Sequence, residues 1–314
     1  MANQMTMPGS IPMGPQTTPL NSPDGKQPNM GPTPNPLQKY FRQPKIYITL
    51  PSKGNWYPAG TLELPENGEI PVYAMTAKDE LSFKTPDALI NGKATVEVIQ
   101  SCIPAIKNAW TMPTIDLDAV LVAIRLATYG EKLELATKIP NTLPVIEKTF
   151  DLDLRKVLDK FGAIAYEHIL NHREMQITLR PLTYQEFTKT ALKTFEEQRL
   201  FSAINDDGIS EQERLARFND SFLKLTDITI NTVVNSIVQI QVEGQIVVDQ
   251  AQIAEFIEKA DKEFYTVITD HIQAQRSKFE MEPVKVEATE EERKAGAPDT
   301  YEIPVQFDQA NFFA

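Results

Sequence analysis

Cysteine is nearly absent from this chain of 314 residues, because Cys102 is the only one. A single cysteine cannot form an intramolecular disulfide, so the sequence implies neither a disulfide-rich scaffold nor an oxidising compartment. Cys102 lies in "VIQSCIPAI", on the apolar face of a predicted helix, and no histidine nearby would activate it as a nucleophile. We therefore predict that it is a small core residue.

Long apolar runs and an excess of basic residues are also lacking. No apolar run approaches the roughly 18 residues of a membrane-spanning helix, and the opening "MANQMTMPGSIPMGPQ" has neither the basic nor the apolar region of a secretory signal. The formal net charge is −12, from 31 Lys and Arg against 43 Asp and Glu. Such a chain repels nucleic-acid phosphates and anionic lipid headgroups. The sequence therefore predicts a soluble protein made in the cytoplasm, with neither nucleic acid nor membrane as its partner.

Histidine occurs only three times. His168 and His172 are four residues apart in a stretch predicted to be helical, which would place both imidazoles on one face, as zinc sites require. A mononuclear site normally needs a third protein ligand, and only His271 remains. The pattern favours ordinary helix histidines, and a metal-dependent hydrolase using His168 and His172 is an alternative.

Two pairs of aspartates, Asp116 with Asp118 and Asp151 with Asp153, each precede a predicted helix. Paired carboxylates can act as general acid and base, but carboxylates at a helix N-terminus also cap free backbone N–H groups and suit the helix dipole. Capping is the favoured role here. The glycines do not have the spacing of a phosphate-binding loop. We therefore predict a protein that is not an enzyme, with no catalytic residue, no cofactor site and no metal site.

The composition divides the chain into four predicted segments. Residues 1–44 hold ten of the 23 prolines, which predicts a disordered arm, either a passive tail or a segment that orders along a neighbouring subunit. Residues 45–182 have the pattern of an α+β domain, and residues 183–281 that of a mainly helical lobe. Residues 282–314 read as an acidic tail with two strand-like pieces.

The predicted fold class is α+β, with a small N-terminal β-meander packed on helices and a mainly helical C-terminal lobe. "KIYITL", "TLELP" and "GEIPVYAM" have the patterns of short strands. "DLDAVLVAIRLATYG" is the clearest helix, with an apolar stripe and a glycine stop. Thr183 and Glu186 have capping-box spacing at the start of another helix, and Ser210 and Glu213 repeat it.

The stretch "LPSKGNWYPAG", residues 50–60, combines turn-forming glycine and proline with Trp56 and Tyr57. An aromatic pair in a turn is either buried by the fold or presented to a partner. We expect packing between the first strands and the following helices, with presentation to a partner as the alternative.

Several pieces of the sequence also occur in a known order: "LPSKGNWYP", "GEI", "MTAKDELSFKTPDALINGKA", "VIQSCI", "DLDAVLVAIRLATYG" and "ITLRPLTY". Together they resemble the baseplate (hub) protein family of contractile-tailed, T-even-like bacteriophages. The resemblance covers roughly residues 45–185. It also implies a Cys-Pro-X-Cys-like knuckle after the "YG" segment, but the corresponding "ATKIPNTLP" has no thiolate ligand. We expect packing alone to hold that loop.

The resemblance implies a structural component of the virion tail baseplate, at or near the central hub, that acts through protein–protein contacts during tail assembly. The alternative is a chaperone for hub assembly that is absent from the virion. The expected partners are other baseplate or hub proteins. Candidate contact residues are Trp56 and Tyr57 in the turn, and Phe312 and Phe313, which either anchor the tail in a neighbour's pocket or form a frayed terminus.

Overall fold

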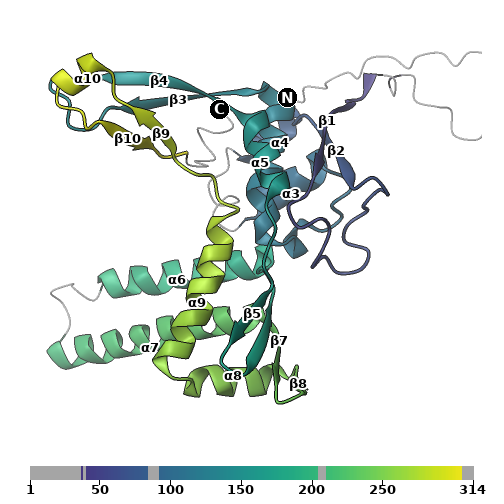
Figure 1. Cartoon of the computed structure of the whole chain (residues 1–314), viewed down its shortest axis with the longest axis vertical. Helices are drawn as coiled ribbons and strands as arrows, with labels where there is room; N and C mark the ends of the chain where they lie inside the picture. Colours follow the sequence, from purple (N-terminus) through teal and green to yellow (C-terminus); the bar gives the residue numbers. More distant parts are fainter. Residues whose placement is uncertain (1–36, 38–39, 84–91, 204–209, 306–314) are drawn as a thin grey trace, which may run out of the picture. The chain divides into compact units, whose positions relative to one another are not determined.

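The computed structural model describes residues 37, 40–83, 92–203 and 210–305 (Figure 1). The described residues from Arg42 onwards belong to one compact unit. Most of the predicted arm lies outside the described residues, as do Phe312 and Phe313. The proposed boundaries between the four segments stay predictions.

The described residues combine helices with small antiparallel sheets, which confirms the α+β class. The strands are β1 (Pro44–Thr49), β2 (Glu69–Tyr73), β3 (Lys132–Lys138), β4 (Glu147–Asp153), β5 (Ile169–His172), β6 (Met175–Leu179), β7 (Ile237–Val242), β8 (Gln245–Val247), β9 (Val284–Glu287) and β10 (Thr300–Ile303). The helices are α1 (Ala77–Phe83), α3 (Lys93–Cys102), α4 (Leu117–Tyr129), α5 (Leu154–Ala163), α6 (Tyr184–Ala203), α7 (Glu211–Ser236), α8 (Gln250–Lys259), α9 (Lys262–Ser277) and α10 (Glu290–Lys294).

The predicted N-terminal meander is wrong in its middle strand. β1 and β2 pair antiparallel, with Ile48 opposite Ile70, but "TLELP" forms only an isolated bridge between Leu62 and Ile106. Its backbone groups bond to the segment that follows α3, where the Glu63 amide donates to the Ala105 carbonyl at 2.8 Å. Pro65, two residues after Glu63, has no backbone N–H to donate, so the pairing cannot extend into a ladder of hydrogen bonds.

Helix α4 forms the centre of the largest apolar cluster. Its residues from Ala119 to Ala127 are buried, and Val120, Val122 and Ile124 are fully buried. The helix contacts β1, β2, α3 and α5, so it is covered on several sides. A helix that is apolar nearly all round has to be enclosed in this way, because water would otherwise meet its side chains.

A second apolar cluster lies between the four-stranded sheet β5–β6–β7–β8 and helices α7, α8 and α9. Ile177 and Leu179 alternate along β6 toward this core, and both are fully buried. The stretch at residues 237–242 was expected to continue a helical region. It forms β7 instead, because its β-branched residues Ile237 and Ile240 complete the sheet and are buried there.

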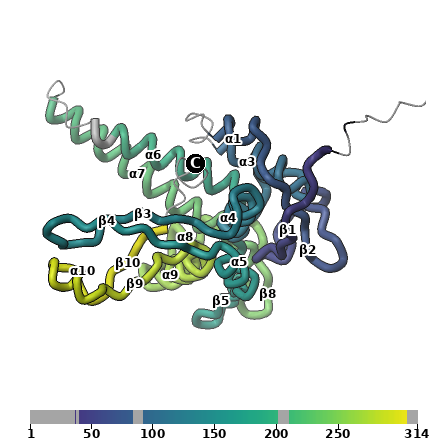
Figure 2. Tube along the Cα trace, turned by 90° about the horizontal axis from the view of Figure 1, so that it is seen from above, coloured from purple at the N-terminus to yellow at the C-terminus, as the bar shows by residue number. Residues whose placement is uncertain are grey.

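A third cluster joins two hairpins that are far apart in the sequence, β3–β4 and β9–β10 (Figures 1 and 2). The two strand-like pieces predicted in the acidic tail are β9 and β10. Between them, α10 begins with a capping box formed by Thr289 and Glu292. Lys148 on β4 also pairs with Glu292 at 2.8 Å. The apolar cluster and the ion pair together fasten the C-terminal hairpin to β3–β4.

The loop between β3 and β4 is held by hydrogen bonds as well as by packing, so the expectation of packing alone was wrong. The Leu143 amide donates to the Ala295 carbonyl at 2.9 Å, and the Thr142 hydroxyl donates to the Ile139 carbonyl at 3.0 Å. Gly296 lies against this loop with φ +110°, and a Cβ there would lie 2.5 Å from the Asn141 carbonyl oxygen.

The predicted helix caps are confirmed where both partners are close in sequence. The Thr183 amide donates to Glu186 at 2.8 Å, and the Glu186 amide donates to the Thr183 hydroxyl at 3.2 Å. Arg180 adds two hydrogen bonds to the same Glu186 carboxylate. The Ser210 hydroxyl accepts from the Glu213 amide at 3.2 Å, as the sequence predicted.

Replacing Gly296 by alanine should lower the free energy of unfolding by about 2 kcal/mol or more, because the new Cβ meets a backbone carbonyl and φ is positive. Gly162→Ala is the matched control. Nothing lies within 4 Å of a Cβ at this position in α5, so a gain of up to about 1 kcal/mol is expected. Urea unfolding followed by circular dichroism measures both, and equal midpoints for Gly296→Ala and wild type would contradict the packing described.

Candidate functional site

The loop of residues 50–60 leaves β1 in a series of tight turns. The Lys53 amide donates to the Leu50 carbonyl at 2.9 Å, and the Asn55 amide donates to the Ser52 carbonyl at 3.0 Å. Lys53 and Trp56 have positive φ, 53° and 67°, which is unusual for residues with a side chain. Such a backbone persists only where the surrounding contacts hold it.

The contact that holds this loop is the carboxylate of Asp116, which is fully buried. Its Oδ1 accepts from the Ser52 amide at 2.7 Å, and its Oδ2 accepts from the Ser52 hydroxyl at 2.6 Å and from the Tyr57 hydroxyl at 3.0 Å. Three donors from one loop therefore converge on one carboxylate. Charge-assisted hydrogen bonds of this kind are among the strongest in proteins.

This arrangement corrects the capping role predicted for Asp116 and Asp118. Asp116 occupies the N-cap position of α4, but its side chain accepts no hydrogen bond from that helix. Asp118 accepts from the Met281 amide at 3.3 Å, on the segment after α9. Asp153 does cap α5, as predicted, by accepting from the Arg155 and Lys156 amides.

Burial changes the titration of these carboxyl groups. Removal of Asp116 from water raises its pKa to about 6, although the hydrogen bonds from Ser52 and Tyr57 oppose that shift. Burial likewise raises the pKa of Asp118 to about 6, and the hydrogen bond from Met281 opposes it. Burial, followed by the nearby Asp116 charge, holds the pKa of Tyr57 well above its usual value, so this phenol stays a hydrogen-bond donor.

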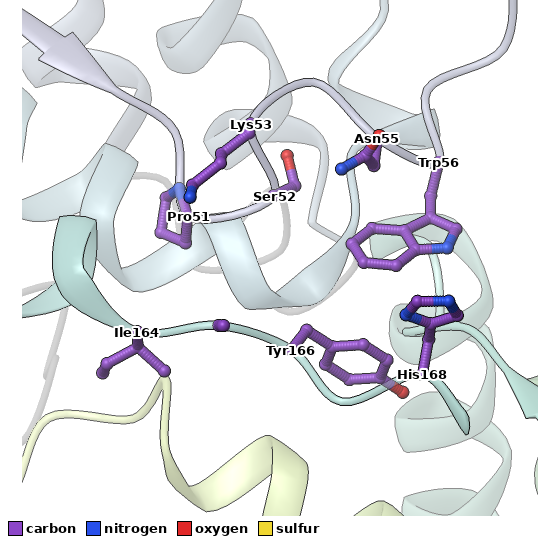
Figure 3. A pocket seen from close by; sticks show the side chains of 9 residues that line it. Pro51, Ser52, Lys53, Asn55, Trp56, Ile164, Tyr166 and His168 are labelled. Atoms are coloured by element: carbon purple, nitrogen blue, oxygen red, sulfur yellow. The ribbon is translucent and has the colours of Figure 1, made fainter. Parts of the chain in front are cut away.

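A cavity of about 460 Å³ opens between the loop and the segment that follows α5 (Figure 3). The loop contributes Pro51, Ser52, Lys53, Asn55 and Trp56, and the second segment contributes Ile164, Ala165, Tyr166 and His168.

Aromatic rings gather at one end of the cavity. In Figure 3 the Trp56 indole, the Tyr166 ring and the His168 imidazole lie near one another. The Trp56 and Tyr166 centroids are 5.2 Å apart in an edge-to-face arrangement, and Tyr166 approaches Phe279 at 6.3 Å. Burial raises the pKa of Tyr166, so its hydroxyl remains protonated. This end of the cavity offers apolar ring surface with a donor.

Polar and cationic groups stand at the rim. Lys53, Asn55 and His168 are exposed, whereas Trp56 and Tyr166 are half-buried. The cavity can therefore take an aromatic or proline side chain against the rings, while the Lys53 ammonium and the Asn55 amide can bind polar or anionic groups of the same ligand. A short polypeptide segment is a ligand that combines these groups.

The two residues predicted for this turn have different roles. Trp56 lines the cavity, and Tyr57 directs its hydroxyl to Asp116. Sequence reasoning missed Asp116 and Tyr166. Asp116 is 64 positions from Ser52, and its place before a helix indicated a cap. No local pattern links Tyr166 to the loop.

The helical premise of the proposed His168 and His172 metal site is wrong. Helix α5 ends at Ala163, His168 lies between elements, and His172 ends strand β5. The His172 ring lies 5.4 Å from the Phe264 ring. Among residues 37, 40–83, 92–203 and 210–305, no three or more His, Cys, Asp and Glu side chains are grouped as metal ligands.

Cys102 is a fully buried core residue, as predicted. Burial, and next the nearby Asp79 charge, raise the pKa of its thiol to about 12. The Arg42 guanidinium acts on the thiol in the opposite direction and lowers its pKa. Arg42 itself donates hydrogen bonds to the Ser101 hydroxyl and to the Ala74 carbonyl. The thiolate form that a nucleophile requires is therefore scarcely populated at neutral pH.

Comparison with known proteins identifies a family for this chain. A family model described as T4 bacteriophage base plate protein matches residues 57–299. No curated protein matches the sequence and no solved structure matches the fold. Within the part of the chain that the structure describes, no helix has the length and apolar character that a membrane crossing needs.

The raised pKa of Asp116 predicts a measurable pH dependence of stability. The folded state holds this proton more tightly than the unfolded state, whose ordinary value is 3.8, so the contribution is fully present below about pH 4 and is lost as the pH rises through about 6. In Asp116→Asn the group no longer titrates. The wild-type free energy of unfolding should therefore fall relative to this variant by about 3 kcal/mol between about pH 3 and pH 7.

Tyr57→Phe is the control, because it removes one hydrogen bond but keeps the buried carboxyl group. This variant should retain the wild-type direction of pH dependence. Urea titrations at several pH values supply all three curves. Parallel curves for wild type and Asp116→Asn would show that this carboxyl does not titrate in the stated range.

Proposed function

Because the chain belongs to the T4 bacteriophage base plate protein family, we propose that it is a structural component of a contractile-tailed phage baseplate, located at or near the central hub. The match over residues 57–299 carries this proposal, since it spans most of the described chain, from Tyr57 at the end of the loop through the central helix α4 to the residues just before β10. The resemblance of residues 45–185 supports the hub location. The chain acts through protein–protein contacts during tail assembly.

The cavity beside Trp56 supplies one of those contacts. It binds a short segment of a neighbouring baseplate protein, with an aromatic or proline residue against Trp56 and Tyr166 and an acidic group near Lys53. The hydrogen bonds of Asp116 hold the loop in its binding conformation before the partner arrives. A preorganised loop loses less conformational entropy on binding than a flexible one.

The chaperone alternative requires the same partners, but the chain would leave before the virion is complete. The hydrolase alternative has lost its geometric basis, because His168 and His172 do not share a helix. Metal analysis of the purified full chain tests it directly, since stoichiometric zinc or iron would restore that alternative.

Mass spectrometry of purified virions, and of baseplates released from them, should detect the chain in a fixed ratio to the other baseplate proteins. Phage lacking the gene should fail to complete baseplates. Absence from mature particles combined with failed baseplates would assign the chain to the chaperone role instead. Absence combined with normal baseplates would contradict both roles.

Substitution of side chains that line the cavity should weaken binding to baseplate intermediates without unfolding the protein. Trp56→Ala removes the ring surface, and an aromatic anchor of this kind is worth about 2 kcal/mol, or roughly 30-fold in affinity. Lys53→Glu reverses the charge at the rim while leaving the ring packing in place. Binding is measured by co-sedimentation with intermediates from phage that lack the chain.

Tyr47→Ala is the matched control, because Tyr47 is 61 % exposed on β1 and does not line the cavity. It should bind as wild type does, and thermal unfolding should be checked for all three variants. Wild-type binding by both Trp56→Ala and Lys53→Glu would remove this cavity from the interface, while the baseplate role would still depend on the virion analysis.

A further inference from the structure

Helices α6 and α7 lie side by side (Figure 2). A space between them is nevertheless lined mostly by polar side chains. That space is bounded by Glu186, Lys189, Thr190, Lys193, Ile228, Asn231, Thr232 and Asn235. Farther along, Lys224 on α7 pairs with Glu197 on α6 at 3.8 Å, and the Glu197 side chain is only 15 % exposed. Where these residues lie, the contact between the two helices is therefore largely hydrophilic.

The outer face of α7 carries large apolar side chains instead. Leu215 is 61 % exposed, Phe222 is 59 % exposed and Leu223 is 61 % exposed. An ordinary surface helix places its apolar face inward and its polar face toward water. Here the distribution is inverted along several turns, which is typical of a surface that another protein covers.

The spacing of these residues indicates a helix as the covering element. Leu215, Phe222 and Thr229 are seven residues apart, and the exposed Phe218 and the half-buried Leu225 fall between them at the remaining positions of a heptad stripe. The flank of this stripe away from α6 is formed by Ala216, Asn219 and Leu223, none of which is charged. A second apolar helix would meet no unpaired charge there.

The two halves of the stripe differ in shape. The first half carries the large residue Leu215, whereas the second half borders a cavity of about 560 Å³ beside α8 and α9. This groove is lined by Phe222, Leu225, Thr226, Thr229, Ile230, Ile257, Glu258, Ala260, Lys262 and Tyr265. Projecting side chains and a receptive groove thus lie on the same face of one helix.

We propose that this face binds a second copy of the chain, with the two α7 helices antiparallel and a twofold axis at Phe222. In that register, Leu215 of one protomer enters the groove beside Thr229 of its partner, and the reverse contact forms by symmetry. Phe222 meets its own counterpart at the axis. A twofold interface requires such self-complementarity, with the same patch supplying both the projection and the groove.

The charge distribution favours a second copy as the occupant. The whole chain has a net charge of −12, which makes copies repel one another over most of their surface. The helix pair is close to neutral, with three acidic and three basic residues in α6, and four acidic and three basic residues in α7. Arg217 also pairs with Glu213 at 2.6 Å, and Lys224 pairs with Asp220 at 2.8 Å. Two copies can approach here without strong repulsion.

Sedimentation velocity of the full-length protein over a range of concentrations tests the proposal. Wild type should sediment as a dimer, and Phe222→Glu should sediment as a monomer with an unchanged far-ultraviolet circular dichroism spectrum. Val248→Glu is the matched control, because Val248 is also exposed, at 62 %, but lies outside α7. This variant should remain dimeric. A wild type that stays monomeric throughout, or a Phe222→Glu protein that remains a dimer, overturns the proposal.

Disulfide cross-linking tests the register, and the buried position of Cys102 keeps the background low. Phe222→Cys should cross-link to itself under mild oxidation. Leu215→Cys should not cross-link to itself, but a mixture of Leu215→Cys and Thr229→Cys proteins should form the mixed disulfide. Self-linking of Leu215→Cys would overturn the antiparallel arrangement. A monomeric wild type that pairs through Phe222 only with another baseplate protein would replace the second copy with that partner.

Discussion

The buried carboxylate of Asp116 is the interaction on which the described structure most depends. It binds the amide and hydroxyl of Ser52 and the hydroxyl of Tyr57, at the point where the first loop meets the start of α4. Two residues later, Asp118 binds the Met281 amide, on the segment that leads to the C-terminal hairpin. The N-terminal end of α4 therefore gathers segments from the beginning, the middle and the end of the described chain.

This way of joining segments has an energetic cost and a structural advantage. A carboxylate removed from water loses hydration, which is why the pKa of Asp116 rises to about 6. In return, its hydrogen bonds have strict geometry, and they hold Lys53 and Trp56 in backbone conformations that their own sequence does not favour. Apolar packing alone would allow the loop more than one arrangement. The hydrogen bonds therefore fix the position of Trp56 at the edge of the cavity.

The apolar clusters explain how the rest of the chain supports an interaction protein. Helix α4 lies at the centre of the first cluster. Strands β6 and β7 contribute buried residues to the second, and the two hairpins β3–β4 and β9–β10 pack against each other in the third. Each cluster joins elements that are distant in the sequence. Two exposed features, the cavity beside Trp56 and the outer face of α7, contain ring or aliphatic surface that water covers poorly. Baseplate assembly requires surfaces of this kind.

The sequence by itself determined the features that depend on neighbouring residues. The helix of α4 and the N-terminal caps at Thr183 and Ser210 follow from spacings of three to four residues, which fix local geometry wherever the chain lies. Only the tertiary structure decided the role of Asp116, the place of His168 and the pairing of "TLELP". A carboxylate before a helix can bind that helix or a distant loop, and the choice depends on which donors the folded chain brings close and shields from water.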